Sequence, residues 1–333
     1  MGRKALYWAA AAAAMVLLFV ADLLVGSTHI PATDVWKALS GKEVSGLTST
    51  IVVDIRLSKA LTALFSGIAV SVSGLLMQTL FRNPLAGPYV LGVSSGASLG
   101  AAAFVLGFGP ATLLGESAAS SLGIAGAAWT GSAAILILIA FASRKIKDIM
   151  VILILGMMLG SGIDAVVQIM QYLSDESSLK SYVIWTMGSL GNVNGLQLSI
   201  LAACTAAGLV ISTACVKPLN LLMLGEHYAS TSGLDIGRTR NLIFLATILL
   251  SGTVTAFCGP LGFLGLAVPH LTRFIVRDAD HRALLPGTVL CGGSLMLVCD
   301  IISKSTALPV NAITSLMGIP VIIWVVTKNR KLM

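Results

Sequence analysis

The sequence predicts an all-α integral membrane protein: a single polytopic domain, residues 1–333, of about ten transmembrane helices. Only 11% of the residues are charged and the mean hydropathy is +0.93, whereas soluble domains carry about 25% charged residues. Most of the long apolar stretches approach the ~20 residues that cross a bilayer as a helix. They are continuous rather than alternating, which excludes a membrane β-barrel. The stretches are residues 6–25, 60–80, 89–108, 118–142, 149–170, 196–216, 241–257, 261–276, 283–302 and 310–326.

The first stretch follows Arg3 and Lys4, as the core of a signal peptide would. Its apolar run is longer than a signal core and no small-residue cleavage site follows it, so we expect a retained span. If the N-terminus is cytosolic, ten spans place 15 of the 21 Lys and Arg residues on the inner side and 6 on the outer side. This bias predicts that both termini are cytoplasmic. The basic residues are scattered over loops without aromatic partners, so nothing indicates nucleic-acid binding.

Charged residues occur near the outer ends of several spans. Arg56 and Lys59 lie three residues apart, so they share one helical face at the start of the second span. Either they have a functional role there or they snorkel to the membrane interface. Asp22 and Asp300 lie near the ends of their own spans, and we expect them to reach headgroups or loops.

Glycine spacing predicts where helices pack closely. The third span carries Gly92, Gly96 and Gly100 at four-residue spacing, a stripe that lets a neighbouring helix approach. Residues 259–273 combine glycines at three-residue spacing with two prolines, which indicates a broken or tightly packed helix. With the preceding stretch, this segment forms either two tight antiparallel spans or a partly re-entrant pair.

A polar face runs along the fifth span. Ser161, Asp164, Gln168 and Gln171 recur at the spacing of one helical face. An acid at membrane depth is costly, so it should face the bundle interior or a watery cavity. This face therefore either lines a translocation route or packs against a neighbouring helix.

The polar segment 217–240 predicts two short helices between spans. Pro218 can open the first helix, and Gly225 can end it in the left-handed conformation. Gly233 repeats the stop after a second short helix, and Asp235 can cap the next long one. Such a stiff cytosolic projection suits force transfer to a partner.

The sequence does not support a metal site, a cofactor site or an ATP-binding site. The 5 cysteines are unpaired in spacing and the 4 histidines are dispersed, so we expect no metal or cofactor site. The chain also lacks the Gly-x-x-x-x-Gly-Lys-Ser/Thr phosphate loop. If ATP drives this protein, a separate chain must bind it.

Five motifs, in order along nearly the whole chain, resemble the permease subunit of the type II ABC importers for vitamin B12, haem and ferric siderophores. The motifs are Arg56-x-x-Lys59; Gly74-x-x-x-Gln78-x-x-x-Arg82-Asn83-Pro84-Leu85-Ala86-x-Pro88-x-x-Leu91-Gly92; Leu224-Gly225-Glu226-x-x-Ala229; Phe263-x-Gly265-Leu266-x-Val268-Pro269-His270-x-x-Arg273; and Leu308-Pro309-Val310 leading to Gly318-x-Pro320.

The resemblance implies a type II ABC importer permease fold, a homodimer of ten-span chains in the bacterial inner membrane, two ATP-binding subunits, and a periplasmic or extracellular substrate-binding protein. It implies no cofactor and no catalysis by the chain itself. Its fifth span lines the path, which favours Ser161, Asp164 and Gln168 as path residues. The residues implied to couple to the ATPase are Leu224, Gly225, Glu226, His227, Tyr228, Ala229 and Gly233. The cations implied to meet the binding protein are Arg56, Lys59 and Lys304. The most specific motif residues are Arg82, Asn83, Pro84, Pro269, His270 and Arg273.

Two other function classes stay open at this point. One is an ion-coupled secondary transporter, with Asp164 as its coupling residue and broken helices at 259–273. The other is an intramembrane enzyme, which no nucleophile–base pair or metal motif supports. Among cargoes, cobalamin, haem and iron–siderophore chelates all fit the resemblance, and we favour an iron chelate because such family members are numerous.

Overall fold

The computed structural model describes residues 3–42, 44–107, 119–146, 148–193 and 195–329, and every regular element within them is helical. Three basic residues assigned to the inner side, Lys147, Arg330 and Lys331, lie outside these ranges. The longer helices are α1 (Arg3–Leu24), α4 (Ser58–Leu80), α5 (Val93–Ala102), α6 (Ala119–Ala142), α7 (Ile149–Leu173), α8 (Glu176–Thr186), α9 (Gly195–Ala214), α12 (Ile236–Thr247), α14 (Leu264–Val276), α15 (His281–Thr306) and α16 (Val310–Asn329). The shorter ones are α2 (Ala32–Leu39), α3 (Gly46–Ser49), α10 (Val216–Met223), α11 (Glu226–Thr231) and α13 (Thr253–Cys258).

Within the described residues, each of the ten apolar stretches overlaps one or more helical segments. Within the described ranges, six helical segments are long and apolar enough to cross a membrane, and four shorter apolar helices accompany them. The long segments are Gly46–Leu80, Gly123–Ala142, Ile149–Leu173, Gly195–Ala214, Ile236–Cys258 and His281–Thr306. The short ones are Trp8–Leu24, Val93–Gly107, Leu264–Val276 and Val310–Trp324.

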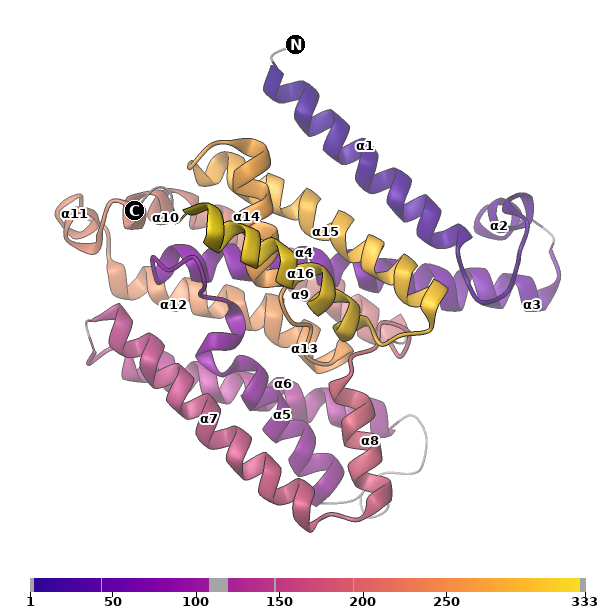
Figure 1. Cartoon of the computed structure of the whole chain (residues 1–333), viewed down its shortest axis with the longest axis horizontal. Helices are drawn as coiled ribbons and strands as arrows, with labels where there is room; N and C mark the ends of the chain where they lie inside the picture. The colour runs from indigo at the N-terminus through magenta and orange to yellow at the C-terminus, as the bar shows by residue number, and fades with distance from the viewer. Residues whose placement is uncertain (1–2, 43, 108–118, 147, 194, 330–333) are drawn as a thin grey trace.

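Helix α4 forms the centre of the molecule. From Ser66 to Leu80 every residue of α4 is buried, because α9, α12, α14 and α15 pack around it. Helix α1 packs on the outside of α15, while α5, α6, α7 and α8 form a second group below the first in Figure 1. The fold therefore consists of two groups of helices, with the largest apolar core around α4.

Glycines set the closest helix contacts, as the sequence predicts. A Cβ atom added to Gly74 on α4 would lie 1.8 Å from the Gly265 carbonyl oxygen on α14. On α5, a Cβ at Gly96 or Gly100 would lie 2.6 or 2.0 Å from backbone oxygens of α6. Gly92, the third member of that stripe, instead precedes α5 with a left-handed φ of 72°.

The segment after α13 is a turn followed by one short helix. Gly259 (φ 76°) and Phe263 (φ 65°) bend the chain between α13 and α14. Helix α14 has 13 residues, so it extends about 20 Å, less than the ~30 Å of hydrocarbon. Pro269 lies buried inside this helix. The glycines and prolines of residues 259–273 therefore make a tight turn and close packing, and no break occurs within α14.

Candidate functional site

Helices α10 and α11 form a projection between α9 and α12, which we call the knob (residues 216–233; Figure 1). Its turns lie at the two glycines that the sequence indicates, although Gly225, with ψ 151°, is extended and does not adopt the predicted left-handed helical cap. Gly225 joins the two helices with a φ of 111°, and Gly233 ends the second with a φ of 85°. The Asp235 carboxylate accepts a hydrogen bond from the Arg238 amide at 2.9 Å and so caps α12. Local glycine and capping signals thus fix the shape of the knob.

The knob presents an apolar tip. Leu219, Leu222 and Ala229 are buried and anchor the two helices to the rest of the protein. Leu224 and Tyr228 are 64% and 53% exposed. Both are large apolar side chains exposed on a short projecting segment. His227 is exposed beside them.

Glu226 faces inward and holds the second half of the knob. Its Oε1 atom lies 2.7 Å from Nη2 of Arg240, and the side chains are 28% and 5% exposed. Nη1 of Arg240 also donates to the Ile146 carbonyl oxygen at 3.4 Å, just before α7. The sequence indicates Glu226 but gives no role to Arg240, whose partner lies 14 residues away in the chain.

The specific motif residues meet beside the knob. The His270 Nε2 atom lies 2.8 Å from the Pro84 carbonyl oxygen, so α14 holds the turn after α4. The Asn83 carboxamide accepts from the Leu85 amide at 2.9 Å and shapes that turn. Arg82 has a left-handed φ of 47° and its side chain is exposed.

A third residue joins this arrangement. The Gln78 side chain accepts from the Arg273 guanidinium and donates to the Leu266 carbonyl oxygen at 3.2 Å. These contacts lie at a cavity of about 300 Å³ that also includes Met223 of the knob. The two motifs are therefore one structural unit beside α10, joined by Gln78 and by the contact of His270 with Pro84.

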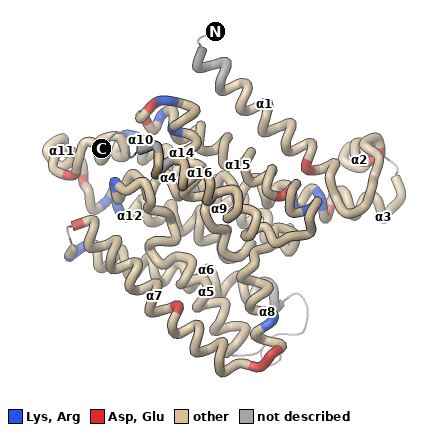
Figure 2. Tube along the Cα trace, in the orientation of Figure 1, with Lys and Arg blue, Asp and Glu red and all other residues tan. Residues whose placement is uncertain are grey.

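The three cations predicted to meet a binding protein, Arg56, Lys59 and Lys304, are buried or half-buried. Lys304 pairs with Asp22 and with Asp300, both at 2.8 Å, and Lys59 pairs with Asp300 at 3.1 Å. Asp22 and Asp300 are 0% exposed. The expectation that these acids reach headgroups or loops is wrong, because each has a lysine partner from another span. Figure 2 shows charged segments gathered at these ends of α1 and α15.

Arg56 is also buried, at 4% exposure. Its guanidinium donates to the carbonyl oxygens of Leu23 and Leu24, each at 3.1 Å, and to that of Thr28. The first two carbonyls belong to the last turn of α1, where the helix itself supplies no partner, and Thr28 lies just beyond the helix. Arg56 therefore fastens α1 to the start of the second span.

The polar face of α7 is exposed in the single chain. Ser161, Asp164 and Gln168 are exposed on α7, whereas Gly156 and Gly160 of the same helix are buried. Gly160 approaches Gly92 and Ser95 at the start of α5. The polar face therefore lies next to the packing face on α7, and its three side chains are exposed in the single chain.

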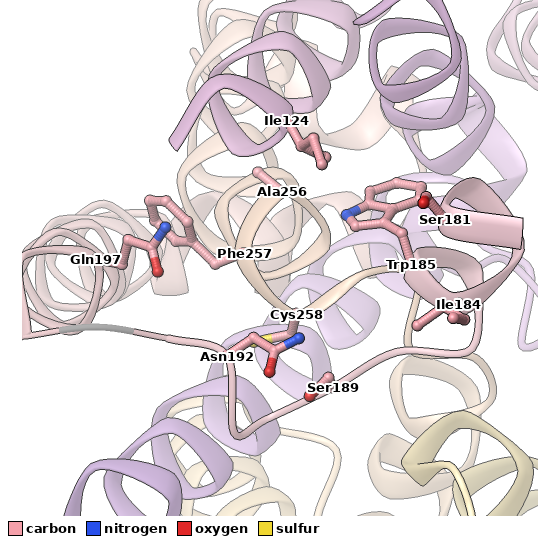
Figure 3. Close-up of a pocket in the computed structure, with 10 residues that line it drawn as sticks. All are labelled: Ile124, Ser181, Ile184, Trp185, Ser189, Asn192, Gln197, Ala256, Phe257 and Cys258. Atoms are coloured by element: carbon pink, nitrogen blue, oxygen red, sulfur yellow. The ribbon is translucent and has the colours of Figure 1, made fainter. Parts of the chain in front are cut away.

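A cavity lies between α6, α8, α9 and α13 (Figure 3). It measures about 170 Å³, and Trp185, Asn192, Gln197 and Cys258 contribute to its walls. Pockets for drug-sized ligands measure about 300–1,000 Å³, so this space suits a few waters rather than a large chelate. The cavity does not provide a route for such a cargo through one chain.

Comparisons with known proteins identify the family over nearly the whole chain. The FecCD transport family model matches residues 14–328. The vitamin B12 import system permease protein BtuC of Citrobacter koseri is 36% identical, over 95% of this chain and 92% of that protein. The hemin transport system permease protein HmuU of Yersinia pestis is 33% identical, over 95% of each chain. A solved metal-chelate type ABC transporter in an inward-facing conformation matches with a TM-score of 0.83 and 29% identity, over 96% of this chain and 98% of that one. The chain therefore belongs to the FecCD transport family.

Proposed function

We propose that this chain is the permease subunit of an ATP-driven importer that moves a metal chelate of the haem, cobalamin or siderophore class across the bacterial inner membrane. The observation that carries the proposal is the 33–36% identity, over 95% of the chain, to permeases named for vitamin B12 and hemin import. The same family membership favours an importer over an ion-coupled secondary transporter and over an intramembrane enzyme. The whole chain acts as one permease domain with both termini in the cytoplasm.

In this proposal a separate ATP-binding subunit binds the knob. The exposed side chains of Leu224, His227 and Tyr228 form the contact surface, while buried Ala229 anchors α11. Gly225 and Gly233 hold the turns that present this surface. Two such subunits serve the two copies of the chain.

A second copy of the chain covers the exposed face of α7. Asp164 and its polar neighbours on that face are exposed, and an acid exposed to hydrocarbon is unfavourable. Two copies with facing α7 helices would enclose a polar route that one chain does not contain. Ser161, Asp164 and Gln168 then line the path between the copies.

The outer ends of α4 and α15 receive a substrate-binding protein. Lys59 is the most accessible of the three cations, with a side chain 22% exposed, whereas Lys304 is 7% exposed. Lys59 is therefore the cation that meets an acidic partner, while Arg56 and Lys304 position the surface around it.

The test is reconstitution in vesicles with the ATP-binding subunit and the binding protein from the same source. We expect ATP-dependent uptake of one of three probes: hemin, cobalamin or a ferric siderophore. Gly225→Pro and Glu226→Lys should abolish both uptake and stimulation of ATP hydrolysis. Thr231→Ala, an exposed change on the same short helix, should leave both unchanged. Uptake on an ion gradient by the permease alone would overturn the proposal.

A further inference from the structure

The two halves of the knob are fastened to different helices of the protein. The first half, α10, is held through Asn220. The Asn220 Oδ1 atom lies 3.0 Å from the backbone nitrogen and 2.7 Å from Nδ1 of His281, the first residue of α15. The Asn220 carboxamide nitrogen donates to Asp280 at 2.6 Å, and Asp280 caps α15. Three hydrogen bonds therefore join α10 to the start of α15.

His281 extends this connection to α4. Asn220 uses its nitrogen on Asp280, so its oxygen is the acceptor and Nδ1 of His281 carries the proton. The other ring nitrogen, Nε2, lies 2.8 Å from the Thr79 hydroxyl at the end of α4. His281 is 0% exposed and Thr79 is 5% exposed. A buried imidazole with a partner on each side connects α10, α15 and α4.

Helices α4 and α15 are joined along their whole length. They cross at Gly67 and Gly292, where an added Cβ atom would lie 2.4–2.6 Å from the facing carbonyl oxygen. At the outer end, Lys59 reaches Asp300. Because contacts occur at both ends and in the middle, a displacement of α15 carries α4 with it.

The second half of the knob connects elsewhere. Glu226 of α11 pairs with Arg240 of α12, and Arg240 reaches the Ile146 carbonyl oxygen before α7. Only Leu224 and Gly225 separate the two halves, and the φ of 111° at Gly225 is one that other residues rarely adopt. The single joint between the halves is thus a conformationally permissive residue.

We propose that the knob is a two-armed lever jointed at Gly225, in which His281 transmits the movement of α10 to the α4–α15 pair and Arg240 transmits the movement of α11 to α12 and the start of α7. This inference rests on the proposed function, since the ATP-binding subunit (the motor subunit) must supply the movement. His281 is a positioning residue in this scheme and touches no cargo.

The test separates the two bonds of the imidazole. The amide nitrogen of Asn takes the position of Nδ1, so His281→Asn keeps the bond to Asn220 and loses Thr79. The amide of Gln reaches the position of Nε2, so His281→Gln keeps Thr79 and loses the side-chain bond to Asn220, while the backbone nitrogen of residue 281 and Asp280 still bond to Asn220. Thr288→Val is the matched control, because this buried hydroxyl on α15 has no hydrogen-bond partner among the described residues.

Each variant is assembled with the motor subunits and the binding protein in vesicles, and cargo imported per ATP hydrolysed is measured. Both His281 variants should lower this ratio by about fivefold or more, the usual size of one coupling term, with hydrolysis itself within about twofold of wild type. The Thr288→Val ratio should be unchanged. A purely structural role would lower the amount of assembled complex and leave the ratio intact, and that result would overturn the inference.

Spin labels on Lys217 of α10 and Arg282 of α15 give a second readout, because both side chains are exposed. The distance distribution should broaden in His281→Gln and stay narrow in His281→Asn, which retains the bond to Asn220. Equal widths in the two variants would contradict the lever. If the wild-type complex imports nothing with ATP, the proposed function itself fails. If the wild-type complex imports cargo and the variants match it, only the lever fails.

Discussion

Breaking the ion pair between Glu226 and Arg240 should loosen the second half of the knob by a measurable amount. Loss of one partner of a fully buried pair costs about 3–5 kcal/mol. Here Glu226 is 28% exposed and Arg240 keeps its bond to Ile146, so we expect about 2 kcal/mol, nearer to the cost of a partly solvated pair. This corresponds to a factor of about thirty in the equilibrium constant between α11 bound to α12 and α11 detached from it.

A double-mutant cycle measures the interaction free energy between Glu226 and Arg240. Glu226→Gln, Arg240→Met and the double variant are unfolded in mixed micelles with increasing dodecyl sulfate, and the unfolding free energies are compared. The single changes should each cost about 2 kcal/mol, and the double change should cost less than their sum by about the same amount, because the orphaned charge is removed. Glu176→Gln, an exposed acid on α8, is the control and should be neutral.

The cycle also has an outcome that refutes the reasoning. If the two single effects add without coupling, Arg240 is held by Ile146 and its other surroundings, and Glu226 contributes nothing to the attachment of α11. The second arm of the proposed lever would then lack its link from α11 to α12, even if the ATP-binding subunit still binds the knob.

Three further predictions concern other contacts. Gly74→Ala should lower the apparent melting temperature by about 5–10 °C. The added Cβ would lie 1.8 Å from the α14 backbone and must move to about 3.3 Å, which forces the two helices apart. Gly126→Ala is the control and should have little effect, because its Cβ meets nothing within 4 Å. Asp300→Asn should destabilise the protein by about 3 kcal/mol in the same unfolding assay, since two lysines lose their shared partner. The pKa of Asp280 is lowered by hydrogen bonds from a backbone amide and a carboxamide, so its stabilising cap is complete at neutral pH and is lost only as the pH falls below about 4. Asp280→Asn should therefore remove that part of the acid dependence of the unfolding free energy.

Local signals in the sequence predicted much of the fold because membrane helices leave few alternatives. A continuous apolar run must become a helix when no water is present to satisfy its backbone. The turns of the knob followed from Gly225, Gly233 and Asp235, each of which acts on its own neighbours. The close approach of α5 to α6 followed from the spacing of Gly96 and Gly100.

The ion pairs could not be found in this way. Lys304 and Asp22 are separated by 282 residues, and nothing in the local pattern of either span indicates the other. An acid near the end of a span can reach headgroups as easily as a neighbouring lysine, so only the packing of α1 on α15 decides between them. The bond between Thr79 and His281, 202 residues apart, is of the same kind.

The placement of these long-range contacts determines how force can pass through the protein. Helix α15 has 26 residues and is about 39 Å long. Its polar contacts to α4 lie towards the two ends, at His281 near the knob and at Asp300 far from it, while glycine backbone contacts join the middle. Buried ion pairs tolerate little separation, because each charge left alone is costly. The pair should therefore move as a rigid body, and a displacement at the knob would reach the opposite ends of α4 and α15 without any helix bending.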